Sequence, residues 1–210
     1  TYGQLEERSC RLASWLQNKG VKKGDRVAIL IHNCTEVFEL EFACAKIGAI
    51  ELPLNWRLTK PELEYILNDS SPEVLIYGSN FADTAKALTK DCSIKNSLEI
   101  DDEDQNNEYE QALKENIDFD VVETTHDDLI MLMYTSGTTG HPKGAMITHE
   151  MQFYNIVNLA GSSRVTDKTV QLIVLPLFHT GGMNCYANPI LHYGGQIVLM
   201  KEFDPGKALE

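Results

Sequence analysis

The chain has 210 residues, 43% of them hydrophobic, and a formal net charge of −13. That length and apolar content allow one large domain or two small ones with a real core. No run of about 20 apolar residues could span a bilayer, no signal sequence opens the chain, and its five cysteines are scattered without a Cys-x-x-Cys pair, which predicts a cytoplasmic protein without a zinc site. No basic stripe with interleaved aromatic residues is present, which argues against nucleic acid as a partner.

The first third of the chain has the alternating apolar patterns of a doubly wound α/β unit. Capping-box sequences open two of its helices, at Thr1 and at Thr59. Strand, helix and strand follow one another within about thirty residues, the size of a βαβ crossover with parallel strands. The elements expected in chain order are a helix at 1–20, a strand at 27–31, a helix capped by Thr35 and ended by Gly48, a strand at 50–54, a helix from Thr59, a strand at 74–77 and a short helix at 79–90.

The acidic charge is concentrated in one segment. Residues 99–128 hold thirteen acidic side chains and one lysine. Residues 91–126 also lack strong periodicity, so we expect a long connection with one helix around 109–114. We interpret the acidic segment as a solvated surface excursion rather than a binding tail. It would join a first α/β unit, residues 1–98, to a second, residues 129–210, within one large domain.

A stretch rich in glycine and hydroxyl residues lies between two predicted strands. It comprises residues 134–144, Tyr-Thr-Ser-Gly-Thr-Thr-Gly-His-Pro-Lys-Gly. Glycine lets the backbone approach a ligand closely, free N–H groups and hydroxyls can converge on an anion, and the lysine adds a positive charge. The spacing of ATPase phosphate loops is not met, because the fifth residue after Gly137 is Pro142, and the stretch leads into a strand at 145–147 instead of a helix. The stretch therefore predicts a phosphate-binding loop, with an ordinary Gly/Thr-rich turn as the alternative.

The last part of the chain continues the α/β pattern. The expected elements are a helix capped by Thr148, a strand at 169–175 that ends at Pro176 and is followed by His179, a helix at 183–192 bent at Pro189, a strand at 196–200 and the start of a helix after Phe203. Because the chain begins without methionine and stops at this helix start, we expect it to be a fragment of a longer protein.

The stretch 134–144 resembles the phosphate-binding motif of the adenylate-forming superfamily, which contains acyl-CoA synthetases, peptide-synthetase adenylation domains and luciferases. The resemblance implies the layered α/β sheets of the N-terminal domain of such a ligase. It also implies that a carboxylate attacks ATP to form an acyl-adenylate, with Mg²⁺ as cofactor, and that coenzyme A then takes the acyl group. Other segments match the family in order and spacing, namely Thr1–Leu5, Gly20–Val27, Gly48–Thr59, Leu63–Ser70, Leu175–His179 and Phe203–Pro205.

The resemblance also implies roles for individual residues. Lys143 would neutralise charge on the departing pyrophosphate, and His179 would orient or gate the carboxylate at the mouth of the acyl and ATP pockets. The alternative for His179 is a bond to a nearby backbone carbonyl. The pair Trp56–Arg57 resembles fatty-acyl and related CoA ligases, although a packed aromatic beside a surface cation is equally compatible. The groups that would hold the β- and γ-phosphates are Thr135, Ser136, Thr138, Thr139 and the backbones of Gly137 and Gly140.

The 210 residues lack the family's later elements, among them the glutamate that binds magnesium, the aspartate that holds the ribose and the C-terminal lysine. We therefore expect this chain alone to be inactive and to self-associate through exposed apolar surface. The predicted function of the parent protein is activation of a fatty acid, with an aryl acid as the alternative substrate. Two other classes stay open: a non-catalytic nucleotide-binding or assembly module, and a phosphotransferase. We assign no residue to a metal.

Overall fold

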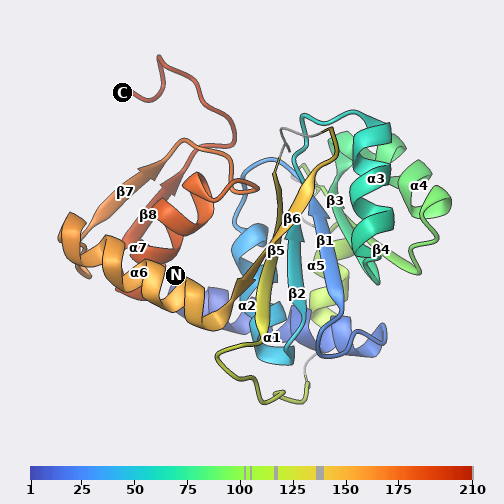
Figure 1. Ribbon diagram of the computed structural model, residues 1–210, viewed down its shortest axis with the longest axis horizontal. Helices are drawn as coiled ribbons and strands as arrows, with labels where there is room; N and C mark the ends of the chain where they lie inside the picture. Colours follow the sequence, from blue (N-terminus) through green and yellow to red (C-terminus); the bar gives the residue numbers. More distant parts are fainter. Residues whose placement is uncertain (102, 105, 116–117, 136–139, 210) are drawn as a thin grey trace.

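The computed structural model describes residues 1–101, 103–104, 106–115, 118–135 and 140–209 (Figure 1). Its elements in chain order are α1 (Tyr2–Asn18), β1 (Arg26–Leu30), α2 (Glu36–Ile47), β2 (Ile50–Pro53), α3 (Lys60–Ser70), β3 (Val74–Gly78), η1 (Ser79–Phe81), α4 (Ala82–Asp91), β4 (Asn96–Ile100), α5 (Glu108–Glu115), β5 (Leu129–Thr135), β6 (Lys143–Thr148), α6 (His149–Ser163), β7 (Val170–Ile173), η2 (Gly181–Ala187), α7 (Asn188–His192) and β8 (Gln196–Leu199). Within the described residues, no helix is both long and apolar enough to cross a membrane.

Six strands form one sheet in the order β4-β3-β1-β2-β5-β6. Neighbouring strands are parallel from β4 to β5, and β6 runs antiparallel to β5. Strands β7 and β8 form a separate parallel pair. In Figure 1 the six-stranded sheet occupies the centre of the molecule, and the two-stranded sheet lies beside it with helices α6 and α7.

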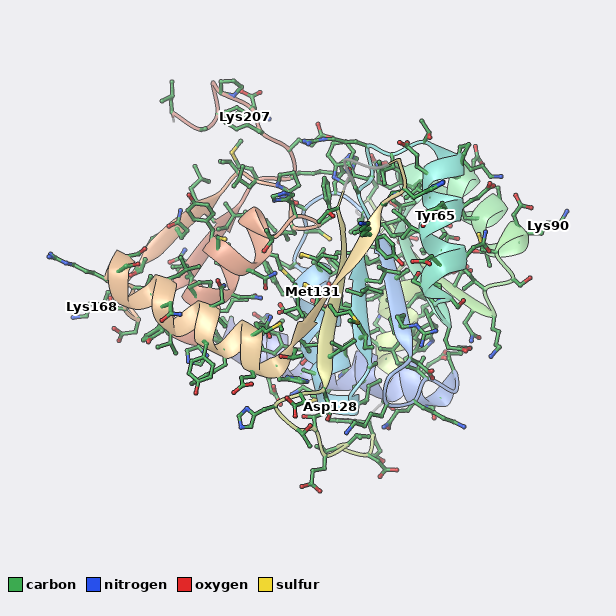
Figure 2. All side chains as sticks on the ribbon, viewed as in Figure 1. Tyr65, Lys90, Asp128, Met131, Lys168 and Lys207 are labelled. Carbon is green, nitrogen blue, oxygen red and sulfur yellow. The ribbon has the colours of Figure 1, made fainter. Side chains whose placement is uncertain are left out.

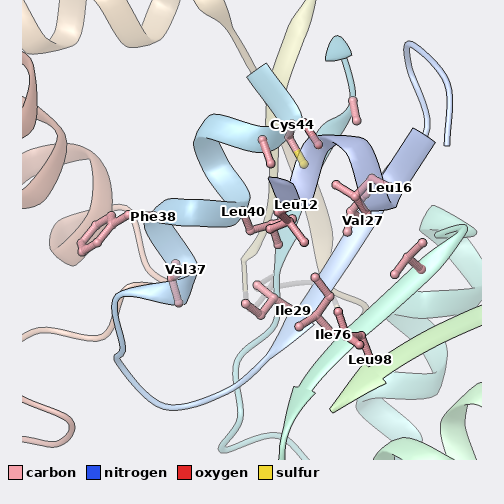
Figure 3. Packing of buried hydrophobic residues seen from close by; sticks show 14 of the residues in the cluster. Leu12, Leu16, Val27, Ile29, Val37, Phe38, Leu40, Cys44, Ile76 and Leu98 are labelled. Carbon is pink, nitrogen blue, oxygen red and sulfur yellow. The ribbon is translucent and has the colours of Figure 1, made fainter. Parts of the chain in front are cut away.

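Helices cover both faces of the large sheet. On β1, Val27 and Ile29 point into a core cluster with α1, α2 and α5, whereas Ala28 and Leu30 point into a second cluster with α3 and α4. Figure 3 shows part of the first cluster, where Leu12 and Leu40 pack near Val27 and Ile29. A strand buried on both faces is apolar at successive positions, which explains the continuous apolar run of β1. The doubly wound α/β arrangement expected from the sequence is confirmed.

Strand β4 corrects the expected long connection over residues 91–126. Asn96–Ile100 pairs in parallel with all five residues of β3 at the sheet edge. Only Leu98 and Ile100 of this strand are buried, so its sequence Asn-Ser-Leu-Glu-Ile carries little apolar signal. Helix α5, expected around 109–114, is present. Strands β5 and β6 extend the same sheet as β1 to β4, so one sheet includes strands from both expected units, and the division into units stays a prediction.

Three of the four expected helix caps are confirmed, including Thr148, whose hydroxyl accepts a hydrogen bond from the Met151 N–H at 3.1 Å. The capping boxes at Thr1 with Gln4 and at Thr59 with Glu62 both form. Thr35 is different, because it has helical dihedral angles and its side chain makes no capping hydrogen bond. Its hydroxyl instead donates to the Glu36 carboxylate at 3.3 Å.

The end of the chain differs from the expected helices in two places. The helix expected at 183–192 begins earlier, as the π-helical segment η2, and continues as α7. Pro189 is the second residue of α7, directly after the change from π-helical to α-helical geometry, and the bend expected there stays a prediction. After Phe203 the described residues form turns instead of a helix.

Two carboxyl groups are buried between α2 and the sheet. Glu41 on α2 is 5% exposed, and Glu51 on β2 is fully buried. The Glu41 Oε1 accepts hydrogen bonds from Gln152 on α6 at 2.6 Å and from Asn188 on α7 at 2.8 Å, but its Oε2 and both Glu51 oxygens have no partner among the described residues. Burial raises the pKa of Glu41 from 4.5 to about 7, and burial and then the Glu41 charge raise the pKa of Glu51.

Glu41→Gln is expected to make folding stability less dependent on pH. A carboxyl whose pKa is higher in the folded state contributes its full stability below pH 4.5 and loses it as the pH rises through about 7. At about 1.4 kcal/mol per pKa unit, the loss for Glu41 is about 3 kcal/mol by pH 8. A glutamine keeps the oxygen that Gln152 and Asn188 need and cannot ionise.

The measurement is urea unfolding between pH 5 and pH 8. The exposed Glu123→Gln is the matched control, since it removes the same charge from the surface. We expect the stability of Glu41→Gln relative to the wild type to rise steadily from pH 5 to pH 8, and Glu123→Gln to follow the wild type. Parallel curves for wild type and Glu41→Gln would show that ionisation of Glu41 does not govern stability.

Candidate active site

The predicted phosphate-binding loop joins β5 to β6 in an antiparallel hairpin. The two strands pair from Leu129 opposite Thr148 to Thr135 opposite Lys143. This confirms the strand-to-strand setting that distinguishes the loop from ATPase phosphate loops. Four of the predicted phosphate-binding residues lie outside the described residues, namely Ser136, Gly137, Thr138 and Thr139.

The structure places the other three loop residues at the open end of this hairpin. Thr135 is exposed, and its hydroxyl donates to the backbone oxygen of Lys143 at 3.5 Å. Gly140 has a φ of +106°, which only glycine adopts readily, and the space where a Cβ would lie is open. The Lys143 side chain is exposed and forms no ion pair with any described residue. A hydroxyl, an accessible backbone and an uncompensated cation form a donor set suited to a polyphosphate.

Helix α3 supports the hairpin at two points. The ring of Tyr65 stacks on His141 with centroids 4.8 Å apart and planes inclined by 20°. The Tyr134 hydroxyl, at the start of the motif, donates to the Asp69 carboxylate at 2.5 Å. Burial and the Asp69 charge raise the pKa of Tyr134, so the phenol keeps the proton that this bond requires. Figure 2 labels Tyr65 on α3, next to the central sheet.

His179 lies on the segment that follows β7, and its ring is held by the backbone of Gly181. Its Nδ1 accepts a hydrogen bond from the Gly181 N–H at 3.0 Å. A neutral ring with this bond carries its proton on Nε2, which has no partner among the described residues. The main-chain groups are bonded too, to the Pro176 oxygen at 3.2 Å and to the Met183 N–H at 3.1 Å. The alternative of a bond from His179 to a backbone carbonyl does not describe this ring.

The pair Trp56–Arg57 packs beside the His179 segment. The Trp56 ring meets the Phe178 ring edge-on at 6.2 Å. The Arg57 guanidinium lies 4.7 Å from the Trp56 centroid and 5.8 Å from the Phe178 centroid. The pair is therefore a packed aromatic ring with a stacked cation. Both of its side chains contact Phe178, the residue before His179.

The sheet topology explains why these segments share one side of the molecule. Parallel strands have their carboxyl ends at the same edge, where ligands bind in open α/β sheets. Strands β1, β2 and β5 end there, and Asn33 after β1 bonds to residues at the ends of β7 and β8. No hydrogen bond or ion pair among the described residues joins His179 to the hairpin.

Sequence patterns did not reveal three residues that hold these segments, Asn33, Tyr65 and Asp69. For Asn33 a signal exists, since it is a polar residue directly after an apolar strand. Tyr65 and Asp69 lie on the helix α3, away from its apolar stripe, and their partners are distant in the sequence. Nothing local could have indicated them.

A sequence family described as "AMP-binding enzyme" matches residues 1–210, the whole chain. The chain belongs to this family. Among members of the AMP-binding enzyme family, it is 39% identical to a feruloyl-CoA synthase of Amycolatopsis sp over 209 residues, which cover 100% of this chain and 40% of that protein. It is 34% identical to the long-chain-fatty-acid–CoA ligase FadD13 of Mycobacterium tuberculosis over 208 residues, covering 99% of this chain and 41% of that protein. The chain thus spans about 40% of the length of these relatives.

Solved structures show the same AMP-binding fold. ATP-bound MatB from Rhodopseudomonas palustris superposes with a TM-score of 0.90 at 30% identity, covering 99% of this chain and 41% of that one. The N-terminal domain of FACL13 from Mycobacterium tuberculosis superposes with a TM-score of 0.85 at 32% identity, covering 99% and 52%. The fold expected for an N-terminal domain of an adenylate-forming ligase is confirmed.

Proposed function

We propose that the full-length protein carrying this chain activates a carboxylic acid with ATP and transfers the acyl group to coenzyme A. In the first step a carboxylate oxygen attacks the α-phosphorus, pyrophosphate leaves and an acyl-adenylate remains. In the second step the thiol sulfur attacks the acyl carbonyl carbon, and AMP leaves. The observation that carries the proposal is the open end of the β5–β6 hairpin with its exposed Lys143, within a chain that matches the AMP-binding enzyme family over its whole length.

The described residues support specific roles in the first step. Lys143 supplies positive charge to the pyrophosphate as its negative charge develops, and the Thr135 hydroxyl and the Gly140 backbone supply hydrogen bonds. We propose the same phosphate-binding role for Ser136, Gly137, Thr138 and Thr139. The Nε2–H of His179 donates to a carboxylate oxygen and orients the other oxygen toward the phosphorus.

A fatty acid is the first candidate substrate, because the Trp56–Arg57 pair resembles that of fatty-acyl CoA ligases. An aryl acid is the second candidate, favoured by the 39% identity to a feruloyl-CoA synthase. Other relatives are an indoleacetate–CoA ligase and 2-succinylbenzoate–CoA ligases, which also act on aromatic acids according to their names.

Magnesium belongs to the proposal through the family, and we assign none of the described residues to it. They contain no group of three or more His, Cys, Asp or Glu side chains that could hold a metal ion. When bound, Mg²⁺ would neutralise the phosphate oxygens of ATP. In this chain the charge that the residues themselves supply is that of Lys143.

The test is exchange of labelled pyrophosphate into ATP by the full-length protein, with fatty acids, ferulate and indoleacetate as separate substrates. We expect exchange only with an acid present, and AMP release once coenzyme A is added. The methyl ester of the best acid is the matched control, since it lacks the attacking carboxylate. Absence of exchange with every acid would contradict the ligase, and ADP release would instead indicate a phosphotransferase. ATP binding without either reaction would indicate a non-catalytic module.

A further inference from the structure

Asn33 lies at the carboxyl end of β1 and reaches across to the second sheet. The residue is 7% exposed. Its Nδ2 donates to the Leu175 oxygen at 3.0 Å and to the Met200 oxygen at 3.1 Å, and its Oδ1 accepts from the Leu177 N–H at 2.9 Å. Leu175 and Met200 follow β7 and β8, so one side chain connects the ends of both strands of the small sheet to the large one.

The carboxamide suits this position in its chemistry as well as its size. It has two N–H donors and an oxygen acceptor, and here both donors and the oxygen are used on main-chain groups. An aspartate would place negative charge against two carbonyl oxygens, and an aliphatic residue would leave the buried Leu177 N–H and two part-buried carbonyl oxygens without this partner. Asparagine therefore holds the backbone of residues 175–177 in one position relative to β1.

The held segment leads directly to His179. Leu177 is 1% exposed and its side chain belongs to the main core cluster, while its N–H donates to Asn33. The backbone at Leu177 is therefore held both by its side chain and by Asn33. His179 follows in a tight turn closed by the bond from its own N–H to the Pro176 oxygen, and Gly181 fixes its ring. Between Asn33 and the imidazole, Leu177 is buried and bonded to Asn33, and the Phe178 ring packs edge-on against Trp56, so this stretch of backbone has contacts at both residues.

We propose that Asn33 is a positioning residue for His179, which fixes the imidazole over the site where the carboxylate meets ATP. The proposal rests on the function proposed above, since it uses His179 as the group that orients the acid. Asn33 itself touches no substrate. It acts through the main chain of Leu175 and Leu177.

The first test is a double-mutant cycle in the full-length protein, read by pyrophosphate exchange. Asn33→Ala and Asn33→Asp are each expected to lower kcat/KM for the acid by about 10- to 100-fold, while KM for ATP changes little. In a His179→Ala background, Asn33→Ala should cost almost nothing more, because the residue that it positions is gone. Additive effects of the two substitutions, or wild-type activity of Asn33→Ala, would overturn the proposal.

The matched control is Ser14→Ala on α1. Ser14 is buried and its hydroxyl donates to the backbone oxygen of Asp118, so its loss removes a side-chain bond to the main chain that involves none of residues 175–183. This variant should keep wild-type kcat/KM. If Asn33→Ala proves too unstable to assay, the isosteric Asn33→Asp carries the cycle alone.

A second readout separates this proposal from the proposed function. Amide hydrogen exchange of residues 175–183 is expected to accelerate in Asn33→Ala by about 10-fold or more and to be unchanged in Ser14→Ala. Should the wild type activate no acid, the proposed function fails, whereas faster exchange still supports Asn33 as the residue that holds the segment. Unchanged exchange in Asn33→Ala overturns the positioning role whatever the activity.

Discussion

Lys143→Ala in the full-length protein is expected to slow acid-dependent pyrophosphate exchange by about 10²- to 10³-fold, the usual cost of removing one group that stabilises charge in a transition state. The lysine is exposed at the open end of the β5–β6 hairpin and has no ion-pair partner among the described residues. Its charge is therefore available to a ligand. The measurement is the initial rate of exchange at saturating ATP and acid.

Two comparisons make this result specific. Lys168→Ala removes an exposed lysine before β7, which Figure 2 labels at the left, beyond the end of α6. This variant should leave the rate of pyrophosphate exchange unchanged. The melting temperature of Lys143→Ala should match the wild type, because the side chain packs against nothing that the fold requires. A large drop in melting temperature, or an exchange rate equal to that of the wild type, would contradict a role in binding pyrophosphate.

Gly182→Ala is expected to destabilise the fold by about 3 kcal/mol, at the upper end of the usual cost of overpacking. Gly182 is buried in η2, and a Cβ there would lie 2.3 Å from the Pro176 oxygen and 2.8 Å from the Leu175 oxygen. Both atoms belong to the backbone, which cannot move aside as the end of a side chain can. Because this backbone also carries His179, we expect both a lower melting temperature, by about 6 to 12 °C, and a loss of exchange activity.

Gly161→Ala is the matched control for the same chemical change. Gly161 is exposed in α6, with nothing within 4 Å of the position of an added Cβ. Alanine is the better helix former there by about 0.5 to 1 kcal/mol, so this variant should melt slightly above the wild type. If Gly182→Ala melted like Gly161→Ala, the close approach of η2 to residues 175–176 would not constrain the fold.

The contrast between β1 and β4 shows how much of the fold was predictable. Both strands belong to the parallel part of the same sheet, but β1 is buried on both faces and apolar from Val27 to Leu30, whereas β4 lies at the edge and buries only Leu98 and Ile100. A pattern of apolar residues indicates which side chains are buried, but it does not indicate which strands pair through main-chain hydrogen bonds. The sequence therefore predicted β1 and missed β4, which the neighbouring strand β3 completes through main-chain hydrogen bonds.

The site shows the same division. The strand-to-strand setting of the proposed phosphate-binding loop was predictable because glycines, hydroxyls and a lysine lie together within one short stretch, and β5 and β6 confirm that setting. Tyr65 and Asp69 were not predictable, because their partners His141 and Tyr134 become neighbours only when α3 packs beside the hairpin. The Thr35 cap failed for a related reason, since its hydroxyl bonds to Glu36 instead of the helix backbone.

By itself, the sequence determined the doubly wound α/β class, the two capping boxes and the family, because each of these depends on residues that lie close together along the chain. Only the tertiary structure decided that one sheet contains the strands on both sides of the acidic segment, that Glu41 and Glu51 are buried together, and that Asn33 holds the segment leading to His179. These features depend on contacts between residues far apart in sequence. Such contacts form when burial of apolar surface brings whole helices and strands together, and no local pattern encodes which polar groups then meet.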